Sequence, residues 1–142
     1  GKVKVLEYNC RFGDPETQPI MMRLKSNLAK LCISATQGAL DLAKAEWDER
    51  TCLGVVMAAN GYPETYIKGE KIEIPDESLD SKIFHAGTKL EKENIYSNGG
   101  RVLCATALGT DIKDAQTKAY DLIEKVKWEG AYYRTDIGFK AL

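Results

Sequence analysis

The sequence predicts an α+β fold of short, mostly antiparallel strands with one packed helix, and three stretches support this prediction. Residues 51–59 are almost continuously apolar or small, which is typical of a strand buried on both faces. Residues 98–100, Asn-Gly-Gly, separate two β-compatible segments, 95–97 and 101–108, and this predicts a hairpin. Residues 112–126 repeat apolar side chains every three or four positions, as an amphipathic helix does. Strands followed by a helix that packs on one face indicate the α+β class.

The composition limits the chain to one core and favours a small partner. A chain of 142 residues is long enough for a single core with one appended element. Its formal net charge of -1 gives no general attraction to nucleic acid or to an anionic membrane. No apolar run approaches the roughly 20 residues that a membrane span requires. We therefore expect a soluble, cytoplasmic protein that recognises phosphate only through a local site.

The cysteines indicate structural thiols rather than a zinc site. They are far apart in the sequence, with no C-x-x-C pair, at positions Cys10, Cys32, Cys52 and Cys104. Each lies among apolar neighbours or in a periodic segment, as expected for free thiols in a reducing compartment. The single histidine, His85, is interpreted as a packing or surface residue because no second histidine accompanies it.

The amino-terminal residues predict a strand that ends in polar side chains. Apolar and charged side chains alternate over residues 2–8, and side chains two apart on a strand share one face. Glu7, Asn9 and Arg11 therefore share a face. A carboxylate and an amide oxygen suit a hard cation such as Mg²⁺, and a guanidinium suits a phosphoryl or carboxylate oxygen. The pattern indicates phosphoryl transfer, although a surface ion pair between Glu7 and Arg11, contributing at most about 1 kcal/mol, explains the same spacing.

A tight loop and a long helix are expected next. Residues 12–16 combine a turn-forming glycine with Asp14 and Glu16, so the loop can bring two more carboxylates near the metal. Pro19 suits the first turn of a helix, and Gly38 suits its end. Between them the apolar side chains recur at helical spacing, at Ile20, Leu24, Leu28, Leu31, Cys32 and Ala35. The amino end of this helix lies beside the acidic loop and favours an anion there.

The remaining elements are shorter, and one of them suggests a second site. In order we expect a short helix (39–46), the buried strand and its closing turn (51–63), a short strand pair (66–74), an acidic loop (75–81), a strand (82–90), the hairpin (95–108), a helix capped by Asp111 (112–126) and two extended segments (128–133 and 137–139). Arg101 follows Gly99 and Gly100 directly. Backbone N–H groups of the glycines and the guanidinium can together receive a phosphate, although turn formation alone also explains these glycines.

Residues 6–18, Leu-Glu-Tyr-Asn-Cys-Arg-Phe-Gly-Asp-Pro-Glu-Thr-Gln, closely resemble the late ATP-grasp signature of the glycinamide ribonucleotide synthetases, also called phosphoribosylamine–glycine ligases. Further landmarks that resemble the C-terminal domain of this family follow in order, at 54–59 (Gly-Val-Val-Met-Ala-Ala), 61–63 (Gly-Tyr-Pro), 84–88 (Phe-His-Ala-Gly-Thr), 98–103 (Asn-Gly-Gly-Arg-Val-Leu) and 134–138 (Arg-Thr-Asp-Ile-Gly). The resemblance implies that residues 1–46 end an ATP-grasp domain, as its last strand and helix. It implies that residues 47–142 form the glycinamide ribonucleotide synthetase C-terminal domain, with a boundary near Trp47.

The resemblance also implies a reaction and its site. In this family ATP phosphorylates the carboxylate of glycine, and the amine of 5-phosphoribosylamine displaces phosphate to form an amide in de novo purine biosynthesis. Glu7 and Asn9 match the family's ligands for Mg²⁺ or Mn²⁺. Arg11 is expected at the transferring phosphate and Asp14 at the glycine ammonium. Three residues of the fourth landmark are expected to bind substrate, namely Arg101, Gly100 and Gly99.

The family's enzymes are much longer than this chain, so the resemblance implies a C-terminal fragment that is inactive alone. Its expected partners are ATP, glycine, 5-phosphoribosylamine and the missing N-terminal part of the same enzyme, with no nucleic acid and no membrane. Two alternatives remain open. One is a noncatalytic docking or oligomerisation module, the runner-up to the ligase. An ATP-grasp ligase with another acceptor is the other alternative, because Glu7 and Asn9 serve only the nucleotide half of the reaction.

Overall fold

Two antiparallel sheets and three helices make up residues 2–142, the part of the chain that the computed structural model describes. The larger sheet has the strand order β3-β6-β1-β7 and the smaller one β2-β5-β4. The strands are β1 (Thr51–Ala59), β2 (Lys71–Ile72), β3 (Ser81–His85), β4 (Thr88–Glu91), β5 (Asn94–Ser97), β6 (Arg101–Gly109) and β7 (Ala131–Tyr132). The helices are α1 (Thr17–Arg23), α2 (Leu28–Thr36) and α3 (Ile112–Glu124), with 3-10 turns η1 (Leu40–Leu42) and η2 (Phe139–Ala141). None of the helices in this range is long and apolar enough to cross a membrane.

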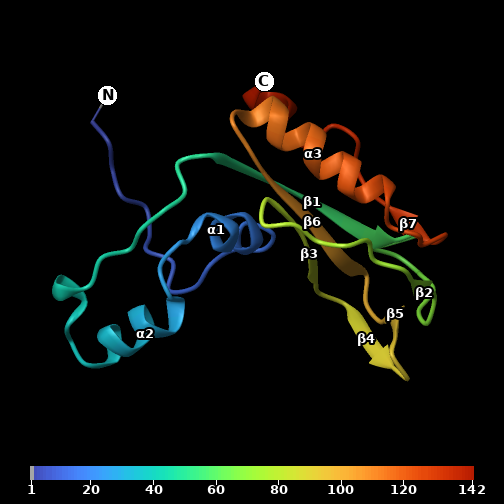
Figure 1. The fold of residues 1–142 in the computed structure, drawn as a ribbon, viewed down its shortest axis with the longest axis horizontal. Coiled ribbons are helices and arrows are strands. Elements are labelled where there is room, and N and C mark those ends of the chain that lie inside the picture. The colour runs from blue at the N-terminus through green and yellow to red at the C-terminus, as the bar shows by residue number, and fades with distance from the viewer. Residues whose placement is uncertain (1) are drawn as a thin grey trace.

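The main core lies between the larger sheet and α3, which runs along one side of the sheet in Figure 1. Because strand side chains alternate, the odd-numbered β1 residues Leu53, Val55 and Met57 share one face, and each is at most 5% exposed. They cluster with α3 residues that recur at helical spacing, namely Ala115, Ala119, Leu122 and Ile123. Burying each large apolar side chain contributes about 1.5–3 kcal/mol. The α+β class is therefore confirmed, with the packed helix at the predicted position.

The other face of β1 is only partly covered. The even-numbered residues Cys52, Gly54 and Val56 are half-buried. Pro19 of α1 packs on Gly54, where an added Cβ would lie 3.0 Å from the Pro19 Cγ. The prediction of burial on both faces is wrong for these positions, because the seven-residue helix α1 covers only part of the face. The uncovered part carries the cavity described below.

The amino-terminal segment is extended but is not a strand. Residues 2–9 have no regular secondary structure, and Val3, Leu6 and Tyr8 are at least 89% exposed. Within residues 2–142, no ladder of backbone hydrogen bonds joins this segment to another strand. Alternating side chains cannot stabilise a strand whose N–H and C=O groups lack partners. The strand predicted here is thus wrong for the described chain.

The helix predicted over residues 19–37 is interrupted. Leu24, the residue after α1, forms an isolated antiparallel bridge with Trp47. Asn27 then begins α2 by accepting a hydrogen bond at 3.1 Å from the backbone N–H of Lys30. An asparagine in this position is a strong helix start, and the apolar periodicity on both sides of it concealed the break. α2 consequently lies away from the sheet (Figure 1).

The hairpin predicted at residues 98–100 is also wrong, because β5 and β6 belong to different sheets. β5 pairs with β4 through a turn at Lys92 and Glu93, whose φ angles of 46° and 68° are those of a tight hairpin. The Asn-Gly-Gly segment instead connects the two sheets. It touches the turn between β3 and β4, since an added Cβ on Gly99 would lie 2.9 Å from the Cα of Gly87.

Smaller differences concern the short elements. Residues 66–74 contain only the two-residue strand β2, the strand predicted at 82–90 is divided into β3 and β4, and residues 137–139 enter a 3-10 turn. In each case the β-compatible pattern is interrupted, either by a glycine or because the chain passes from one sheet to the other. The strand at 51–59 and the α3 cap are confirmed. The Asp111 side chain accepts a hydrogen bond at 2.8 Å from the backbone N–H of Asp114.

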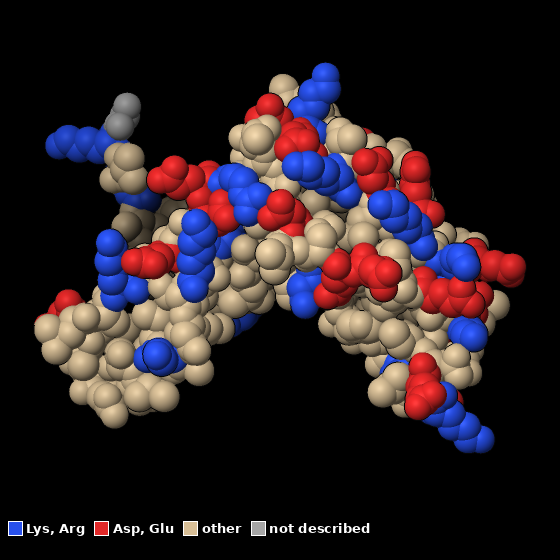
Figure 2. All heavy atoms as spheres, in the orientation of Figure 1, with Lys and Arg blue, Asp and Glu red and all other residues tan. Residues whose placement is uncertain are grey.

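The region of α2 and η1 exposes apolar side chains. Leu28, Ile33, Leu40 and Leu42 are each at least 42% exposed. In Figure 2 this lobe, at lower left, is mostly uncharged, whereas cationic and anionic side chains are interspersed over the remainder of the face shown. Isolated exposed apolar residues are ordinary, but a group of them indicates a surface that packs against something.

Candidate functional site

Four segments that are distant in sequence meet around one cavity. They are the loop before α1, strand β1 with the turn after it, the first residue of β6, and β7 with the segment after it. The cavity has a volume of about 300 Å³ and is lined by Pro15, Gly54, Val56, Ala58, Tyr62, Arg101, Tyr132, Tyr133, Arg134 and Ile137. This volume is at the lower end of the range of small-molecule sites, roughly 300–1,000 Å³. Five of the six motifs, all except residues 84–88, thus contribute to one concave surface.

Tyr62 forms one wall, and glycines allow it to do so. Gly61 has a φ of +93°, a conformation that side chains other than glycine rarely adopt, and this turn presents Tyr62 to the cavity. The ring lies directly on Gly100, which is buried, so an added Cβ there would overlap the Tyr62 ring. Tyr66 supports the ring from the side in an edge-on contact, with centroids 5.9 Å apart. Close packing thus explains Gly100, and its contact with substrate stays a prediction.

Arg101 and Asp14 form an ion pair at the cavity. The Arg101 Nη2 atom lies 2.5 Å from Asp14 Oδ2. The two side chains are 44% and 59% exposed, so water screens the pair and its contribution to folding stability is at most about 1 kcal/mol. Its effect is to hold the guanidinium beside the loop that precedes α1. Two residues that were predicted from separate motifs, 87 positions apart, are therefore adjacent.

Hydrogen bonds hold Arg134 on the segment that follows β7. It donates two parallel hydrogen bonds to Asp136, at 2.8 Å and 2.7 Å. This pairing raises the pKa of Arg134 and holds the pKa of Asp136 below its usual range. The Tyr120 hydroxyl of α3 donates to the Arg134 carbonyl at 2.7 Å and accepts from the Ile137 N–H at 3.1 Å. The core helix therefore anchors the segment that carries this cation.

The predicted metal ligands lie together but outside the cavity. Asn9 Nδ2 lies 3.5 Å from Glu7 Oε1, whereas Arg11 turns away and donates to the carbonyl of Phe12 at 3.1 Å. All three predicted side chains are exposed. Among residues 2–142 no group of three or more His, Cys, Asp or Glu could hold a metal ion. Asn9 presents its amide nitrogen to Glu7 here, so the pair would hold Mg²⁺, which prefers oxygen ligands, only with the amide turned so that its oxygen points at the ion.

The other predicted carboxylate of the loop has a structural partner. Glu16 Oε1 accepts a hydrogen bond at 2.7 Å from the backbone N–H of Gly13. An added Cβ on Gly13 would lie 2.8 Å from the Glu16 carboxyl carbon, so the two residues are in contact. This contact closes the loop just before α1 and directs the Glu16 carboxylate toward the loop backbone. Of the two loop carboxylates, Asp14 is the one that reaches the cavity residues.

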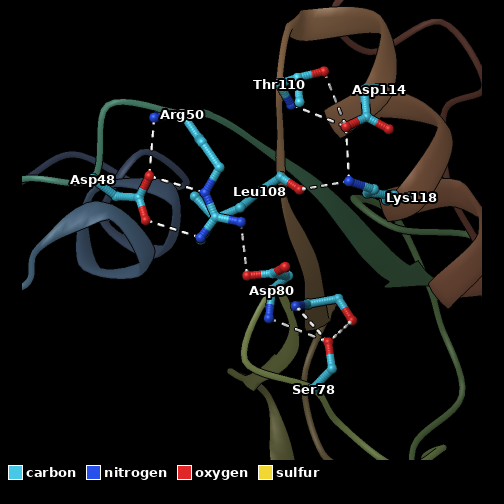
Figure 3. A network of polar contacts seen from close by, with 9 residues as sticks. Asp48, Arg50, Ser78, Asp80, Leu108, Thr110, Asp114 and Lys118 are labelled. Atoms are coloured by element: carbon cyan, nitrogen blue, oxygen red, sulfur yellow. Dashed lines mark hydrogen bonds and ion pairs between the residues drawn. The ribbon is translucent and has the colours of Figure 1, made fainter.

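A polar network fixes the entry of the chain into β1 (Figure 3). Asp48, only 9% exposed, accepts hydrogen bonds from the backbone and guanidinium of Arg50 at 2.9–3.0 Å. The Arg50 guanidinium lowers the pKa of Asp48 well below its usual range. Arg50 also bonds Asp80 at 2.9 Å, and Arg23 of α1 donates to the Asp48 carbonyl at 3.0 Å. The network ties α1 to the larger sheet and so holds the loop that bears Asp14.

The thiols and the histidine take no part in the cavity. Burial raises the pKa of Cys104 to about 12 and that of Cys52 to about 11. Both are therefore neutral thiols at neutral pH and poor nucleophiles. His85 is exposed, and its Nδ1 lies 3.1 Å from the Thr88 hydroxyl. The positions of Cys52 and Cys104 agree with the interpretation of these cysteines as structural residues, and His85 is a surface residue as interpreted. Cys10 and Cys32 are exposed, so the prediction of structural thiols is wrong for these two.

The fold and the landmark residues define a class of protein. Residues 52–140 match the family model described as "Phosphoribosylglycinamide synthetase, C domain". The chain belongs to this family, and the resemblance found in the sequence is confirmed.

The relatives carry one name. The phosphoribosylamine–glycine ligase of Vibrio vulnificus is 51% identical over 144 residues, which cover 100% of this chain and 34% of the relative. That of Pseudomonas syringae pv. tomato is 55% identical, with 100% and 33% covered. The crystal structure of phosphoribosylamine–glycine ligase from Thermotoga maritima aligns with a TM-score of 0.72 and 37% identity, covering 93% of this chain and 32% of that one. The chain thus spans about a third of the length of the curated relatives it matches.

Two cavity residues were not assigned a role from the sequence. Tyr62 and Arg134 belong to landmark motifs, but their spacing gives no sign that they line the same cavity. The sequence offered two signals for these residues. Tyr62 is an aromatic residue between a glycine and a proline in a turn, and Arg134 lies two residues before an aspartate. Tyr120 was interpreted as a core or rim aromatic, and its two hydrogen bonds to the Arg134 segment depend on tertiary structure.

Proposed function

We propose that this chain is the C-terminal part of a cytoplasmic phosphoribosylamine–glycine ligase that acts in purine biosynthesis. The supporting observation is the 51–55% identity to ligases of that name along the whole chain. ATP would transfer its γ-phosphoryl group to a carboxylate oxygen of glycine and release ADP. The amine nitrogen of 5-phosphoribosylamine would then attack the glycyl carbonyl carbon, phosphate would leave with the C–O electron pair, and the nitrogen would lose a proton.

The amino-terminal polar residues are proposed to serve the phosphoryl-transfer half of this reaction. Glu7 and Asn9 would hold Mg²⁺ or Mn²⁺ through their side-chain oxygens, and the cation would neutralise charge on the ATP phosphates. Arg11 would turn from the Phe12 carbonyl to a phosphoryl oxygen, a movement that its exposed side chain permits. Asp14 would receive the glycine ammonium beside Arg101. These contacts act by positioning and by electrostatic stabilisation of developing charge.

We propose residues 1–46 as the end of an ATP-grasp domain and residues 47–142 as the following domain. The family match over 52–140 agrees with this division. The partner proposed for the first part is the upstream portion of the same enzyme, which would cover the apolar side chains exposed on α2 and η1. α1 would stay on the larger sheet, where Pro19 contacts Gly54.

The experiment uses the longer enzyme that carries this segment. ADP release and amide formation are measured with ATP, glycine and phosphoribosylamine, each omitted in turn. We expect turnover only with all three, no turnover by residues 1–142 alone, and a loss of at least about 100-fold in kcat for Glu7→Gln. Glu124→Gln, which changes an exposed carboxylate at the end of α3, is the matched control with unchanged kcat. Turnover without glycine, or full activity of Glu7→Gln, would refute the proposal.

A further inference from the structure

We infer that the cavity between Tyr62, Arg101 and Arg134 binds the phosphorylated pentose of the amine substrate, with both guanidinium groups receiving its phosphate. The inference rests on the proposed function, because that function supplies the substrate class. It adds a binding subsite, a pair of phosphate ligands and a wall for the sugar.

The charges on the cavity lining select for an anion. Its two charged residues are both arginines, and they come from different segments, β6 and the chain after β7. A guanidinium has five N–H donors, of which Arg101 uses one for Asp14 and Arg134 uses two for Asp136. Both therefore keep donors for a ligand while their carboxylate partners fix their direction. Two positioned guanidinium forks match the several acceptor oxygens of a phosphate.

The remaining lining suits a sugar rather than a long anion. The walls are apolar or aromatic, formed by Val56, Ala58, Tyr62 and Tyr133. Tyr62 is fixed by its contact with Gly100, and Tyr133 lies next to Tyr120 of α3 with centroids 6.4 Å apart. A rigid aromatic wall packs on the C–H face of a ring, as small-molecule sites commonly do. A volume of about 300 Å³ accommodates a pentose phosphate more readily than a whole nucleoside triphosphate.

The position of the cavity connects it with the proposed phosphoryl-transfer residues. Pro15 lines the cavity, and the preceding residue Asp14 pairs with Arg101. A pentose phosphate anchored by the arginines would therefore project its amine toward the loop after Arg11, where the activated glycine is proposed to form. Arg101 is shared by the two halves, and Arg134 belongs to the acceptor half alone. This asymmetry makes Arg134 the residue to test.

The test measures substrate-specific effects in the longer enzyme that carries this segment. Arg134→Ala should raise KM for phosphoribosylamine about 10- to 100-fold, the loss expected for charge-assisted hydrogen bonds. The KM values for ATP and glycine should not change. Glycine-dependent exchange of ¹⁸O between bridging and nonbridging positions of ATP should also persist, since it reports reversible phosphoryl transfer to glycine without the amine. Lys140→Ala, an exposed cation nearby that does not line the cavity, is the matched control.

Each outcome decides between the possibilities. A rise in KM for ATP instead of phosphoribosylamine would overturn the inference and assign the cavity to the nucleotide. Normal isotope exchange with an unchanged KM for phosphoribosylamine would overturn the inference and leave the proposed function standing. Absence of turnover by the wild-type enzyme with ATP, glycine and phosphoribosylamine together would overturn both. If Arg134→Ala melts early, Arg134→Lys is used instead, because it keeps the positive charge and loses the fork. A KM for phosphoribosylamine above that of the wild type supports the subsite, and an unchanged KM overturns it.

Discussion

Two glycine substitutions test whether the cavity wall is built as the structure indicates. Gly100→Ala places a methyl group against the Tyr62 ring, whereas Gly87→Ala places one against backbone atoms. Neither glycine has a left-handed φ, so both substitutions act through space alone. The ring is the end of a side chain that can rotate, but the backbone cannot yield locally. We therefore expect different costs from the same chemical change.

The magnitudes follow from the contacts. At Gly87 the new Cβ would lie 2.7 Å from the Arg101 carbonyl oxygen and 2.7 Å from the Gly99 Cα, well inside the 3.4 Å at which ordinary van der Waals contact begins. Two overlaps with backbone atoms predict that Gly87→Ala lowers the free energy of unfolding by about 3 kcal/mol or more, the upper end of the range for overpacking. For Gly100→Ala, rotation of the Tyr62 side chain relieves the overlap, so the free energy of unfolding should fall by only about 1 kcal/mol. The rotated ring no longer forms the cavity wall.

Urea denaturation followed by tryptophan fluorescence measures both free energies of unfolding. In the longer enzyme, Gly100→Ala should also raise KM for phosphoribosylamine. For Gly87→Ala the activity should fall only in proportion to the amount of folded protein. Gly69→Ala is a control for backbone strain alone, because Gly69 has a φ of +86° and no atom within 4 Å of an added Cβ. A Gly100→Ala loss equal to or larger than the Gly87→Ala loss would refute this account of Tyr62.

Three further predictions concern the core, the acid stability and the thiols. Met57→Ala should lower the free energy of unfolding by about 2–5 kcal/mol in urea titrations, since Met57 is 1% exposed in the main core; Leu90→Ala, exposed on β4, should change it by less than about 0.5 kcal/mol. Arg50 lowers the folded-state pKa of Asp48 below 3.8. The ionised Asp48 therefore contributes its full stabilisation of the folded state above that pH, and this contribution is lost as the pH falls further. Asp48→Asn should flatten the fall in melting temperature between pH 4 and pH 2, and an unchanged slope would contradict this. Iodoacetamide at pH 8 should label Cys10 and Cys32, both exposed, before Cys104, whose pKa is about 12; early labelling of Cys104 in the native protein would show that its burial is wrong.

The core could be predicted from the sequence because its pattern is local. A nearly continuous apolar run predicts β1, although only one face of this strand is well buried, and apolar spacing of three to four residues predicts α3. The Asp111 cap has the same local character. The predictions that failed depend on partners far along the chain. Whether residues 2–8 pair with another strand, or whether β5 and β6 share a sheet, is decided by tertiary contacts that no short window contains.

The candidate site divides in the same way. Glu7, Asn9 and Asp14 belong to one continuous motif, so their association could be proposed from a few adjacent residues. The contact of Asp14 with Arg101 spans 87 positions, and the joint lining of one cavity by Tyr62 and Arg134 requires β1 to pair with β7. The helical periodicity that joined α1 to α2 failed for a different reason. Asn27 can begin a new helix inside an otherwise continuous apolar stripe. Whether the chain continues one helix or starts a second one there is decided by the bridge that Leu24 forms with Trp47.

The most direct measurement is a double-mutant cycle on Asp14 and Arg101 in the longer enzyme, with kcat/KM for phosphoribosylamine as the readout. If the loop before α1 and the start of β6 form one site, the two changes are not additive. Asp14→Ala and Arg101→Ala together should then be no worse than the more damaging single change, a coupling of about 0.5–3 kcal/mol. Strictly additive losses would contradict the claim that these two segments act together.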